Sequence, residues 1–496
     1  MGIETVLDMA SSAHPDRIVV GRRNSGLTCR QLGDLASGGA TALRDHGAGH
    51  VVFVGVNGPV LPVLTFASAR AGIPLVPLNY RLSDAQLCDL VAQLDRPVVV
   101  ADPAYAGKLA RAADIVLTTD DFLDLARQVG PAEFAPAPDD ATAIVLFTSG
   151  TTSAPKGVVL RHRNLLSYLF NTVEFASAGE EQAALVSTPP YHIAGMGAVL
   201  SNIYAGRRMV YLPDFSPQGW LGLVRDEGVT SAMVVPTMLA RVVEHLGGAP
   251  AKTPTLASLA YGGARMPQPV LERALVAFPT TGFVNAYGLT ETSSTIAVLG
   301  PDEHREALAD PALRGRLSSV GRIVPGIEAQ IRHDDATVLP DGATGLLWVR
   351  GPQVSGEYMG KGTVLDDDGW FPTRDRARLE DGYLYIGGRA DDTIIRGGEN
   401  IAPAEIEDVL VRHDAVREVA VIGLPDDEWG ERICAVIVPE SAEQLEPEQI
   451  RAWCRERLRG SRTPDDVVFV DDLPRTPTGK LVRRDLVSQV ELVQLV

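Results

Sequence analysis

Residues 146–157, LFTSGTTSAPKG, combine hydroxyl side chains, glycine and one lysine between two apolar runs. Backbone N–H groups in a glycine-containing turn can bind phosphate oxygens, and hydroxyls and a lysine add donors and positive charge. The P-loop pattern G-x-x-x-x-G-K-[ST] does not fit, because Pro155 precedes Lys156 and Gly157 follows it. The alternative is a flexible surface turn, but the unusual composition favours a phosphate-binding loop.

The stretch TSGTTSAPKG resembles the phosphate-binding loop of the adenylate-forming superfamily, which comprises acyl- and aryl-CoA ligases, luciferases and the adenylation domains of peptide synthetases. Four further stretches resemble motifs of that superfamily in the same order, so the resemblance covers nearly the whole chain. It implies nucleotide contacts from the loop and a metal contact from its first threonine after the glycine. The loop residues concerned are Thr148, Ser149, Gly150, Thr151, Thr152 and Lys156, with Thr151 also near the metal.

The second stretch is NAYGLTETSS, residues 285–294. The resemblance implies that Tyr287 lies along the adenine, Thr290 contacts the α-phosphate and Glu291 binds Mg²⁺. A carboxylate is a hard oxygen ligand suited to Mg²⁺ that bridges phosphates. The alternative for Glu291 alone is a solvated surface acid. Further nucleotide contacts are expected from Gly262, Gly263, Ala264, Asn285, Ala286 and Gly288.

The third stretch, DGWFPTRD, resembles the T-G-D motif of the superfamily, whose aspartate accepts both ribose hydroxyls. That aspartate is Asp375 here, whereas Arg374 stands where the superfamily has glycine. Glycine often supplies a positive φ, so this replacement puts the local backbone geometry in question. Ser153 in the phosphate loop likewise replaces a usual glycine.

The fourth stretch, GGRADDTIIRGGENIAPAEIE, begins at Gly387. The resemblance implies that Arg389 reaches the ribose, with Ile386 beside the nucleotide, and that Asp391 is the hinge of a rotating C-terminal domain. Gly397 and Gly398 would line the passage for the pantetheine arm of CoA, because glycines permit close backbone approach. Their alternative is an ordinary turn before the following helix.

The fifth stretch, PRTPTGKLVRRDL, contains Lys480, which matches the catalytic lysine of the superfamily. A lysine near the junction of carboxylate and phosphate stabilises the negative charge that develops during acyl transfer. A lone lysine near a chain end is usually just solvated. The flanking Pro477, Thr478 and Gly479 favour catalysis, since they predict a turn that presents the lysine.

Two weaker matches concern the acid and the thiol. PPYHIAGM resembles the segment that borders the acyl pocket, which would place His192 beside the reacting carboxylate; a structural histidine is the alternative. Trp429 in PDDEWG lies where several aryl-CoA ligases contact the CoA nucleotide, and an ordinary buried aromatic is the alternative. The remaining acyl-pocket candidates are small or apolar: Val235, Thr237, Tyr261, Gly262, Gly263, Leu289 and Ile296.

These residues need a layered scaffold, and the sequence predicts one. Short apolar runs alternate with helical patterns, which predicts α/β units with parallel sheets covered by helices. The strand candidates are residues 50–56, 96–102, 141–149, 183–190, 208–214 and 230–238. After about residue 320, alternating residues and Asp-Gly turns predict antiparallel hairpins in a distorted β-barrel-like subdomain. A helix at 403–413 and two following strands predict a small α+β domain. We expect an N-terminal AMP- and acyl-binding domain at 1–390 and a mobile C-terminal domain at 391–496.

Composition indicates which classes of partner are not expected: nucleic acid, a structural metal and a membrane. A net charge of −18 over 496 residues argues against nucleic-acid binding, which needs a basic surface. The 4 cysteines and 9 histidines show no ligand spacing for a structural metal. The opening residues lack the basic segment of a secretion signal, and prolines and Arg70 interrupt the most apolar stretch, so no membrane span is expected. These features predict a cytoplasmic protein.

The resemblance implies an ATP-dependent carboxylic acid:CoA ligase that uses ATP, Mg²⁺ and coenzyme A in two half-reactions. The pocket candidates offer no arginine for a second carboxylate, which favours a fatty or aromatic monocarboxylate. An amino-acid-activating domain is disfavoured, because PPYHIAGM offers no acid for an ammonium group. Two alternatives stay open: a ligase that delivers the acyl group to an acyl carrier protein, and a non-catalytic relative that binds acyl-adenylates.

Overall fold

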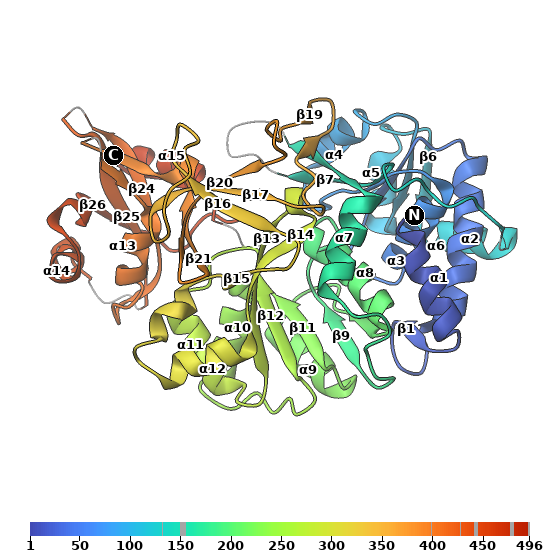
Figure 1. Ribbon diagram of the computed structural model, residues 1–496, viewed down its shortest axis with the longest axis horizontal. Helices are drawn as coiled ribbons and strands as arrows, with labels where there is room; N and C mark the ends of the chain where they lie inside the picture. Colours follow the sequence, from blue (N-terminus) through green and yellow to red (C-terminus); the bar gives the residue numbers. More distant parts are fainter. Residues whose placement is uncertain are drawn as a thin grey trace.

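The computed structural model describes residues 1–130, 132–148, 155–397, 399–426, 428–440, 445–476 and 481–494. Over these residues the chain forms four β-sheets with helices packed on them. The N-terminal helices lie at the right of Figure 1 and the segment after residue 391 lies at the left, so the two ends of the chain are far apart.

The first sheet has the order β19-β18-β8-β7-β4-β3-β5-β6 and is parallel from β7 to β6. Val98 and Val100 of β5 pack into one hydrophobic core, and Val99 and Ala101 into another on the opposite face. Burial of both faces explains the continuous apolar runs. The strands are β3 (His50–Val54), β4 (Leu75–Pro77), β5 (Pro97–Ala101), β6 (Ile115–Thr118), β7 (Thr142–Thr148), β8 (Lys156–Arg161), β18 (Glu357–Tyr358) and β19 (Gly362–Thr363).

Helices from the first third of the chain cover this sheet (Figure 1). Two of them begin with capping boxes, at Thr28 and Thr118. The threonine hydroxyl accepts a hydrogen bond from a backbone N–H in the first turn, and the side chain of that residue accepts one from the threonine N–H. The helices are α1 (Glu4–Ala13), α2 (Cys29–Asp45), α3 (Val60–Ala71), α4 (Asp84–Val91), α5 (Pro103–Leu109), α6 (Thr119–Val129) and α7 (His162–Thr172).

The second sheet has the order β15-β14-β13-β12-β11-β9-β10-β1-β2, with antiparallel strands at both ends. Its strands are β1 (Ile18–Val20), β2 (Leu27–Thr28), β9 (Ala183–Val186), β10 (Arg208–Tyr211), β11 (Ser231–Val234), β12 (Ser258–Gly262), β13 (Gly282–Leu289), β14 (Ser294–Leu299) and β15 (Arg322–Ile323). Its helices are α8 (Ile193–Ala205), α9 (Pro217–Asp226), α10 (Pro236–Leu246), α11 (Gln268–Ala277) and α12 (Pro301–Ala309). Short 3₁₀ helices η1 (Thr290–Thr292) and η2 (Arg314–Ser318) follow β13 and α12.

The third sheet is antiparallel, with the order β16-β17-β20-β21. Its strands are β16 (Glu328–Arg332), β17 (Thr344–Arg350), β20 (Phe371–Glu380) and β21 (Tyr383–Arg389). It shares a core with Ile296 and Ala297 of β14. The predicted hairpins are therefore confirmed, and the subdomain is an open sheet over the described residues, not a closed barrel.

A fourth sheet, β23-β22-β25-β24 with β26 beside β25, follows the 3₁₀ helix η3 (Ala390–Asp392). Its strands are β22 (Ile394–Arg396), β23 (Glu399–Ile401), β24 (Val416–Asp426), β25 (Gly430–Pro439) and β26 (Asp466–Phe469). Its helices are α13 (Pro403–Leu410), α14 (Pro447–Arg457), the 3₁₀ helix η4 (Gly460–Arg462) and α15 (Arg483–Gln494). The predicted helix and strand pair are confirmed here.

Two polar contacts join α13 and the residues just after it to the loop between β12 and α11 and to the first residue of α11. Arg265 forms an ion pair with Asp408, and Arg412 donates to Gln268 Oε1 at 2.7 Å. The mixed α/β class with a large N-terminal and a small C-terminal part is as predicted, while the boundary at residue 391 stays a prediction. Among the described helices, none has the length and apolar character that crossing a membrane requires.

Candidate active site

Asp375, Arg389 and Tyr287 meet where the third sheet packs beside β13. Asp375 on β20 and Arg389 on β21 are cross-strand partners, with Arg389 Nε 3.3 Å from Asp375 Oδ1. The Tyr287 hydroxyl donates to Asp375 Oδ2 at 2.5 Å, and Arg389 also donates to the Thr373 carbonyl at 2.9 Å. Asp375 is only 5% exposed. A carboxylate oxygen has lone pairs for more than one donor, so this group can also accept hydroxyls such as those of a ribose.

The protonation states of Tyr287 and Arg389 suit two partners that hold the Asp375 carboxylate. Burial raises the pKa of the Tyr287 hydroxyl well above its usual value, and the neighbouring Asp375 raises it further. Burial alone would lower the pKa of Arg389, but the surrounding acidic groups, Asp375 foremost and with Tyr287, Glu291 and Asp392, together outweigh it and the pKa is raised. Tyr287 therefore remains a hydrogen-bond donor and Arg389 remains charged at neutral pH.

Glu291 lies in η1, directly after the strand that carries Tyr287. Its Oε1 accepts a hydrogen bond of 2.8 Å from the hydroxyl of Tyr358, and its backbone carbonyl accepts from Ser355 N at 2.8 Å. Among the described residues, Oε2 has no recorded partner. Tyr358 lies in none of the five sequence motifs, and Glu291 is 67 residues away in the chain, so the sequence alone did not indicate it.

The hydroxyl-rich loop joins two antiparallel strands. Thr148 and Lys156 are cross-strand partners at the ends of β7 and β8, and the Thr148 hydroxyl donates to the Lys156 carbonyl at 3.4 Å. The ammonium nitrogen of Lys156 lies 6.0 Å from the centre of the Tyr358 ring. The lysine is thereby connected to Glu291 through one tyrosine, which brings the first and second predicted motifs together.

At two positions of the candidate nucleotide site, Gly262 and Gly288, a neighbouring strand lies too close for any side chain. A Cβ on Gly262 would lie 2.2 Å from the Ala286 carbonyl oxygen, and one on Gly288 would lie 1.9 Å from the Ser294 carbonyl oxygen. Contacts this short exclude a side chain without movement of the strands. Gly263 and Ala264 follow as exposed residues, and Asn285 Nδ2 donates to the Ser319 carbonyl at 3.2 Å.

Arg374, beside Asp375, has a φ of 61°. The resemblance had placed a glycine at this position, and the backbone has kept the left-handed conformation that a glycine adopts without strain. The guanidinium lies 3.9 Å from Asp391 Oδ2, the predicted hinge residue. The replacement therefore leaves Asp375 in place and introduces a strained residue between the candidate ribose site and η3.

The acyl-pocket candidates separate into two groups. Tyr261 is 1% exposed in the core behind the second sheet, and its hydroxyl lies 2.8 Å from His304 Nε2. Leu289 and Ile296 pack in the core between the second and third sheets. Val235 directly precedes α10, where its side chain faces Gly263, and Thr237 in that helix is half-buried. A pocket role of these residues stays a prediction; the hydroxyl of Tyr261 already has a structural partner.

His192 precedes the first residue of α8 and is half-buried, with its ring 5.3 Å from that of Tyr191. Burial raises the pKa of the Tyr191 hydroxyl. The position at a helix N-terminus matches the predicted border of a pocket, since backbone N–H groups there favour an anionic group. The role of His192 beside a carboxylate stays a prediction.

Comparison with known proteins decides the family. The model of the AMP-binding enzymes matches residues 7–359, and the model of the AMP-binding enzyme C-terminal domain matches residues 405–480. The chain belongs to the AMP-binding enzyme family. The predicted membership of the adenylate-forming superfamily is thereby confirmed.

Relatives in this family share nearly the whole chain. A feruloyl-CoA synthase of Amycolatopsis sp is 32% identical over 482 residues, which cover 95% of this chain and 96% of that protein. The indoleacetate–CoA ligase of Aromatoleum aromaticum is 29% identical, with 99% and 98% covered. The fatty acid–[acyl-carrier-protein] ligase ScoC of Streptomyces coeruleorubidus is 32% identical, with 93% and 91% covered. These relatives confirm the predicted enzyme class, an AMP-forming acid–thiol ligase.

Solved structures of the family agree with the fold. The o-succinylbenzoate CoA synthetase MenE of Bacillus subtilis, in complex with its acyl-adenylate intermediate, has a TM-score of 0.85 at 27% identity and 97% coverage of both chains. ATP-bound MatB of Rhodopseudomonas palustris has a TM-score of 0.86 at 26% identity and 99% coverage of both.

In the C-terminal part of this AMP-binding enzyme, two of the predicted CoA contacts, Gly397 and Trp429, lie against each other. Trp429 is 47% exposed, and its ring lies against Gly397, where a Cβ would be 3.0 Å from Trp429 Cε3. Gly397 N donates to the Trp429 carbonyl at 2.7 Å, and the Arg396 guanidinium lies 5.5 Å from the ring centre. An exposed ring with a cation beside it can stack on a base, so the arrangement suits the predicted role without testing it.

Six predicted site residues of this enzyme lie outside the described residues. They are Ser149, Gly150, Thr151 and Thr152 of the phosphate loop, Gly398, and Lys480. Ile386 lies on the same strand as Arg389, β21, and packs against the core between the second and third sheets.

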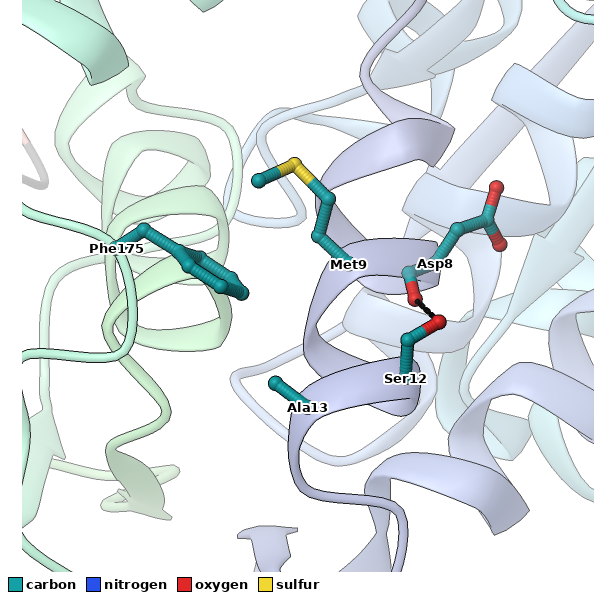
Figure 2. A pocket seen from close by; sticks show the side chains of 5 residues that line it. All are labelled: Asp8, Met9, Ser12, Ala13 and Phe175. Atoms are coloured by element: carbon teal, nitrogen blue, oxygen red, sulfur yellow. Dashed lines mark hydrogen bonds between the residues drawn. The ribbon is translucent and has the colours of Figure 1, made fainter.

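A hollow of about 500 Å³ lies away from all these residues, against α1 (Figure 2). Figure 2 shows Met9 and Phe175 on opposite walls, with Ala13 below and the Ser12 hydroxyl donating to the Asp8 carbonyl at 2.8 Å. None of the residues that line it belongs to the candidate site.

Proposed function

We propose that this AMP-binding enzyme is an ATP-dependent carboxylic acid:CoA ligase for an apolar monocarboxylic acid. The observation that carries the proposal is the convergence of Asp375, Arg389 and Tyr287 with Glu291 and Lys156, in a chain of this family. These residues supply hydroxyl acceptors, positive charge and a carboxylate within one site, as binding of a nucleoside triphosphate requires.

In the first half-reaction, a carboxylate oxygen of the acid attacks the α-phosphorus of ATP, and the bond to pyrophosphate breaks. Asp375 would accept the ribose hydroxyls, with Tyr287 and Arg389 fixing its orientation. Thr290 would contact the α-phosphate, and Lys480 would stabilise the charge at the carboxylate–phosphate junction.

Glu291, with Thr151 of the phosphate loop, would hold Mg²⁺. One carboxylate oxygen of Glu291 has no recorded partner among the described residues, which fits a cation that takes its other ligands from phosphates and water. When bound, Mg²⁺ supplies neutralisation of phosphate charge.

In the second half-reaction, the sulfur of CoA attacks the carbonyl carbon of the acyl-adenylate, AMP leaves, and the thiol proton is released. Lys480 must withdraw to admit the thiol, and we propose that residues 391–496 rotate about Asp391 to allow this. Gly397 and Gly398 would then line the pantetheine passage, and Trp429 would contact the CoA nucleotide.

We infer the chemical class of the acid from the candidate pocket residues and from the names of the relatives. The candidates are small or apolar, without an arginine for a second carboxylate. The names of two relatives, feruloyl-CoA synthase and indoleacetate–CoA ligase, support an aromatic acid over an aliphatic one. His192 would lie at the carboxylate end of the pocket.

A second candidate function is transfer of the acyl group to a carrier protein. The ScoC relative, whose name is a fatty acid–[acyl-carrier-protein] ligase, matches at the same identity as the feruloyl-CoA synthase. A comparison of CoA with a phosphopantetheinylated carrier protein as acceptor separates the two candidates.

The test is acid-dependent pyrophosphate release across aromatic, medium-chain and long-chain monocarboxylates and one dicarboxylate. We expect release with an apolar monocarboxylate and its loss in Lys480→Ala. Lys108→Ala, which removes an exposed lysine paired with Asp84 at 3.1 Å, is the matched control. Unchanged release in Lys480→Ala, or release with none of the acids, would overturn the proposal.

A further inference from the structure

Residues 353–359, which we call the strap, run between two parts of the candidate site. On the side of η1, Gln353 Nε2 donates to the carbonyls of Thr292 and Thr295, at 3.0 Å each. Ser355 N donates to the carbonyl of Glu291 at 2.8 Å. The strap thereby fixes the backbone of the turn that carries the predicted Mg²⁺ ligand.

On its other side the strap is bonded to β8. Tyr358 is the cross-strand partner of Val158, and Met359 N donates to the Gly157 carbonyl at 2.8 Å. Arg161 holds Glu357 by two hydrogen bonds of 2.9 Å each. A bidentate pair of this kind restricts both side chains, so the strap has a defined place against the strand that begins with Lys156.

Tyr358 is the side chain at which these two sides meet. Its hydroxyl donates to Glu291 Oε1 at 2.8 Å, and its ring centre lies 6.0 Å from the Lys156 ammonium. With Oε1 occupied, Oε2 is the oxygen of Glu291 that has no partner among the described residues.

We propose that Tyr358 is a positioning residue for metal binding, which holds Glu291 by one oxygen so that the other is presented to Mg²⁺. The inference rests on the proposed function, because it takes Glu291 as the Mg²⁺ ligand. It assigns a role to a residue outside all five sequence motifs.

The physical reason is the geometry that the ion demands. Mg²⁺ requires a near-octahedral arrangement and gives up its water reluctantly, so a freely rotating carboxylate binds it poorly. A partner that fixes one oxygen reduces the rotamer entropy lost on binding and orients the other.

The test measures ATP binding by calorimetry with Mg²⁺ and with EDTA, for the wild type and for Tyr358→Phe. Phenylalanine keeps the ring and its packing and removes only the hydroxyl. We expect the ratio of the two dissociation constants, with EDTA over with Mg²⁺, to fall by about tenfold, as is usual when the partner of a metal ligand is lost. Binding in EDTA should be unchanged.

Glu291→Gln completes a double-mutant cycle. If Tyr358 acts through Glu291, Tyr358→Phe has no further effect on the ratio in the Glu291→Gln background. An equal effect in both backgrounds, or an unchanged ratio in Tyr358→Phe alone, would overturn the inference. A purely structural role would weaken binding equally with Mg²⁺ and with EDTA, and this outcome also overturns it.

Tyr204→Phe is the matched control, because Tyr204 is a buried tyrosine at the end of α8 distant from His192, packed on Phe170 and Phe175. It should leave the ratio unchanged. Failure of the proposed function looks different: the wild type itself would show no ATP binding, or Glu291→Gln would leave the Mg²⁺ effect intact.

Discussion

Tyr287 and Asp375 are separated by 88 residues in the sequence, and their side-chain oxygens lie 2.5 Å apart. The hydrogen bond connects the second sheet to the third, because Tyr287 is on β13 and Asp375 is on β20. Arg389 holds the other carboxylate oxygen from the neighbouring strand. The candidate ribose site is therefore built at the junction of two sheets, and its geometry depends on how they pack.

Asp375→Asn should weaken binding of ATP and AMP by tenfold or more, since a hydrogen bond to a charged group contributes about 1.5–3 kcal/mol. It should also lower the melting temperature, because Arg389 would be left partly buried without its anionic partner. Glu380→Gln, which removes an exposed carboxylate on the same strand, is the control for both measurements. Unchanged AMP affinity in Asp375→Asn would contradict the assignment of the ribose site.

Arg374→Gly should be more stable than Arg374→Ala, because only glycine adopts a φ of 61° without strain. The expected difference is about 1 kcal/mol in unfolding free energy, measured by urea denaturation. Alanine keeps the strained φ, and both variants lose the guanidinium that lies 3.9 Å from Asp391. The loss of that contact therefore cannot account for a difference in stability between them. Equal stabilities would show that the backbone here relaxes in response to the substitution.

Trp429→Ala should raise the KM for CoA by about tenfold, in line with the loss of one stacked base. Pyrophosphate release in the absence of CoA should be unaffected, because the contacts of Trp429 within the described part of the chain are with Gly397, Arg396 and Asp426, not with the residues around Asp375. A parallel loss in both half-reactions would instead indicate a structural role for the ring against Gly397.

His162 should make the N-terminal region sensitive to acid. Ile3 N donates to His162 Nδ1 at 3.0 Å, which requires the neutral ring. Burial, with a smaller contribution from the amino terminus and opposed by Asp139, lowers the pKa of His162 to about 4 from 6.5. The unfolded chain therefore binds more protons between these values, and stability falls as the pH drops from 6.5 to 4.

The full effect is on the order of 3 kcal/mol, from about 1.4 kcal/mol per pKa unit. Hydrogen exchange of α1, followed from pH 7.5 to pH 4.5, measures it locally. His162→Asn offers a side-chain oxygen that does not titrate, so its profile should be flatter. Identical profiles would assign the acid sensitivity to other groups. The nearby Glu4 is not one of them, because burial raises its pKa and its protonation therefore favours the folded chain as the pH falls.

Much of the site was predictable because its residues come in local motifs. The loop 146–157 was recognisable from its hydroxyls and glycines, and the strand ends that hold it are cross-strand partners as expected of a hairpin. The departure at Arg374 was visible as a missing glycine, and the positive φ found there follows from the same backbone requirement. Strand β5 was also predictable. Successive side chains of a strand point to opposite faces, so apolar residues at every position indicate that both faces are buried, as they are here.

What only the tertiary structure decided is which distant side chains meet. A register shift between Arg376 and Ala377 sets the pairing of Asp375 with Arg389, and a bulge of that kind carries no reliable mark in the sequence. Tyr358 reaches Glu291 only because the strap pairs with β8, and Tyr261 is directed into the core behind β12 and bonded to His304. The sequence by itself determined the chemical groups and the family, since local motifs carry both. The packing of the sheets against one another determined which of these chemical groups meet, because strand register and long-range burial are properties of the whole chain.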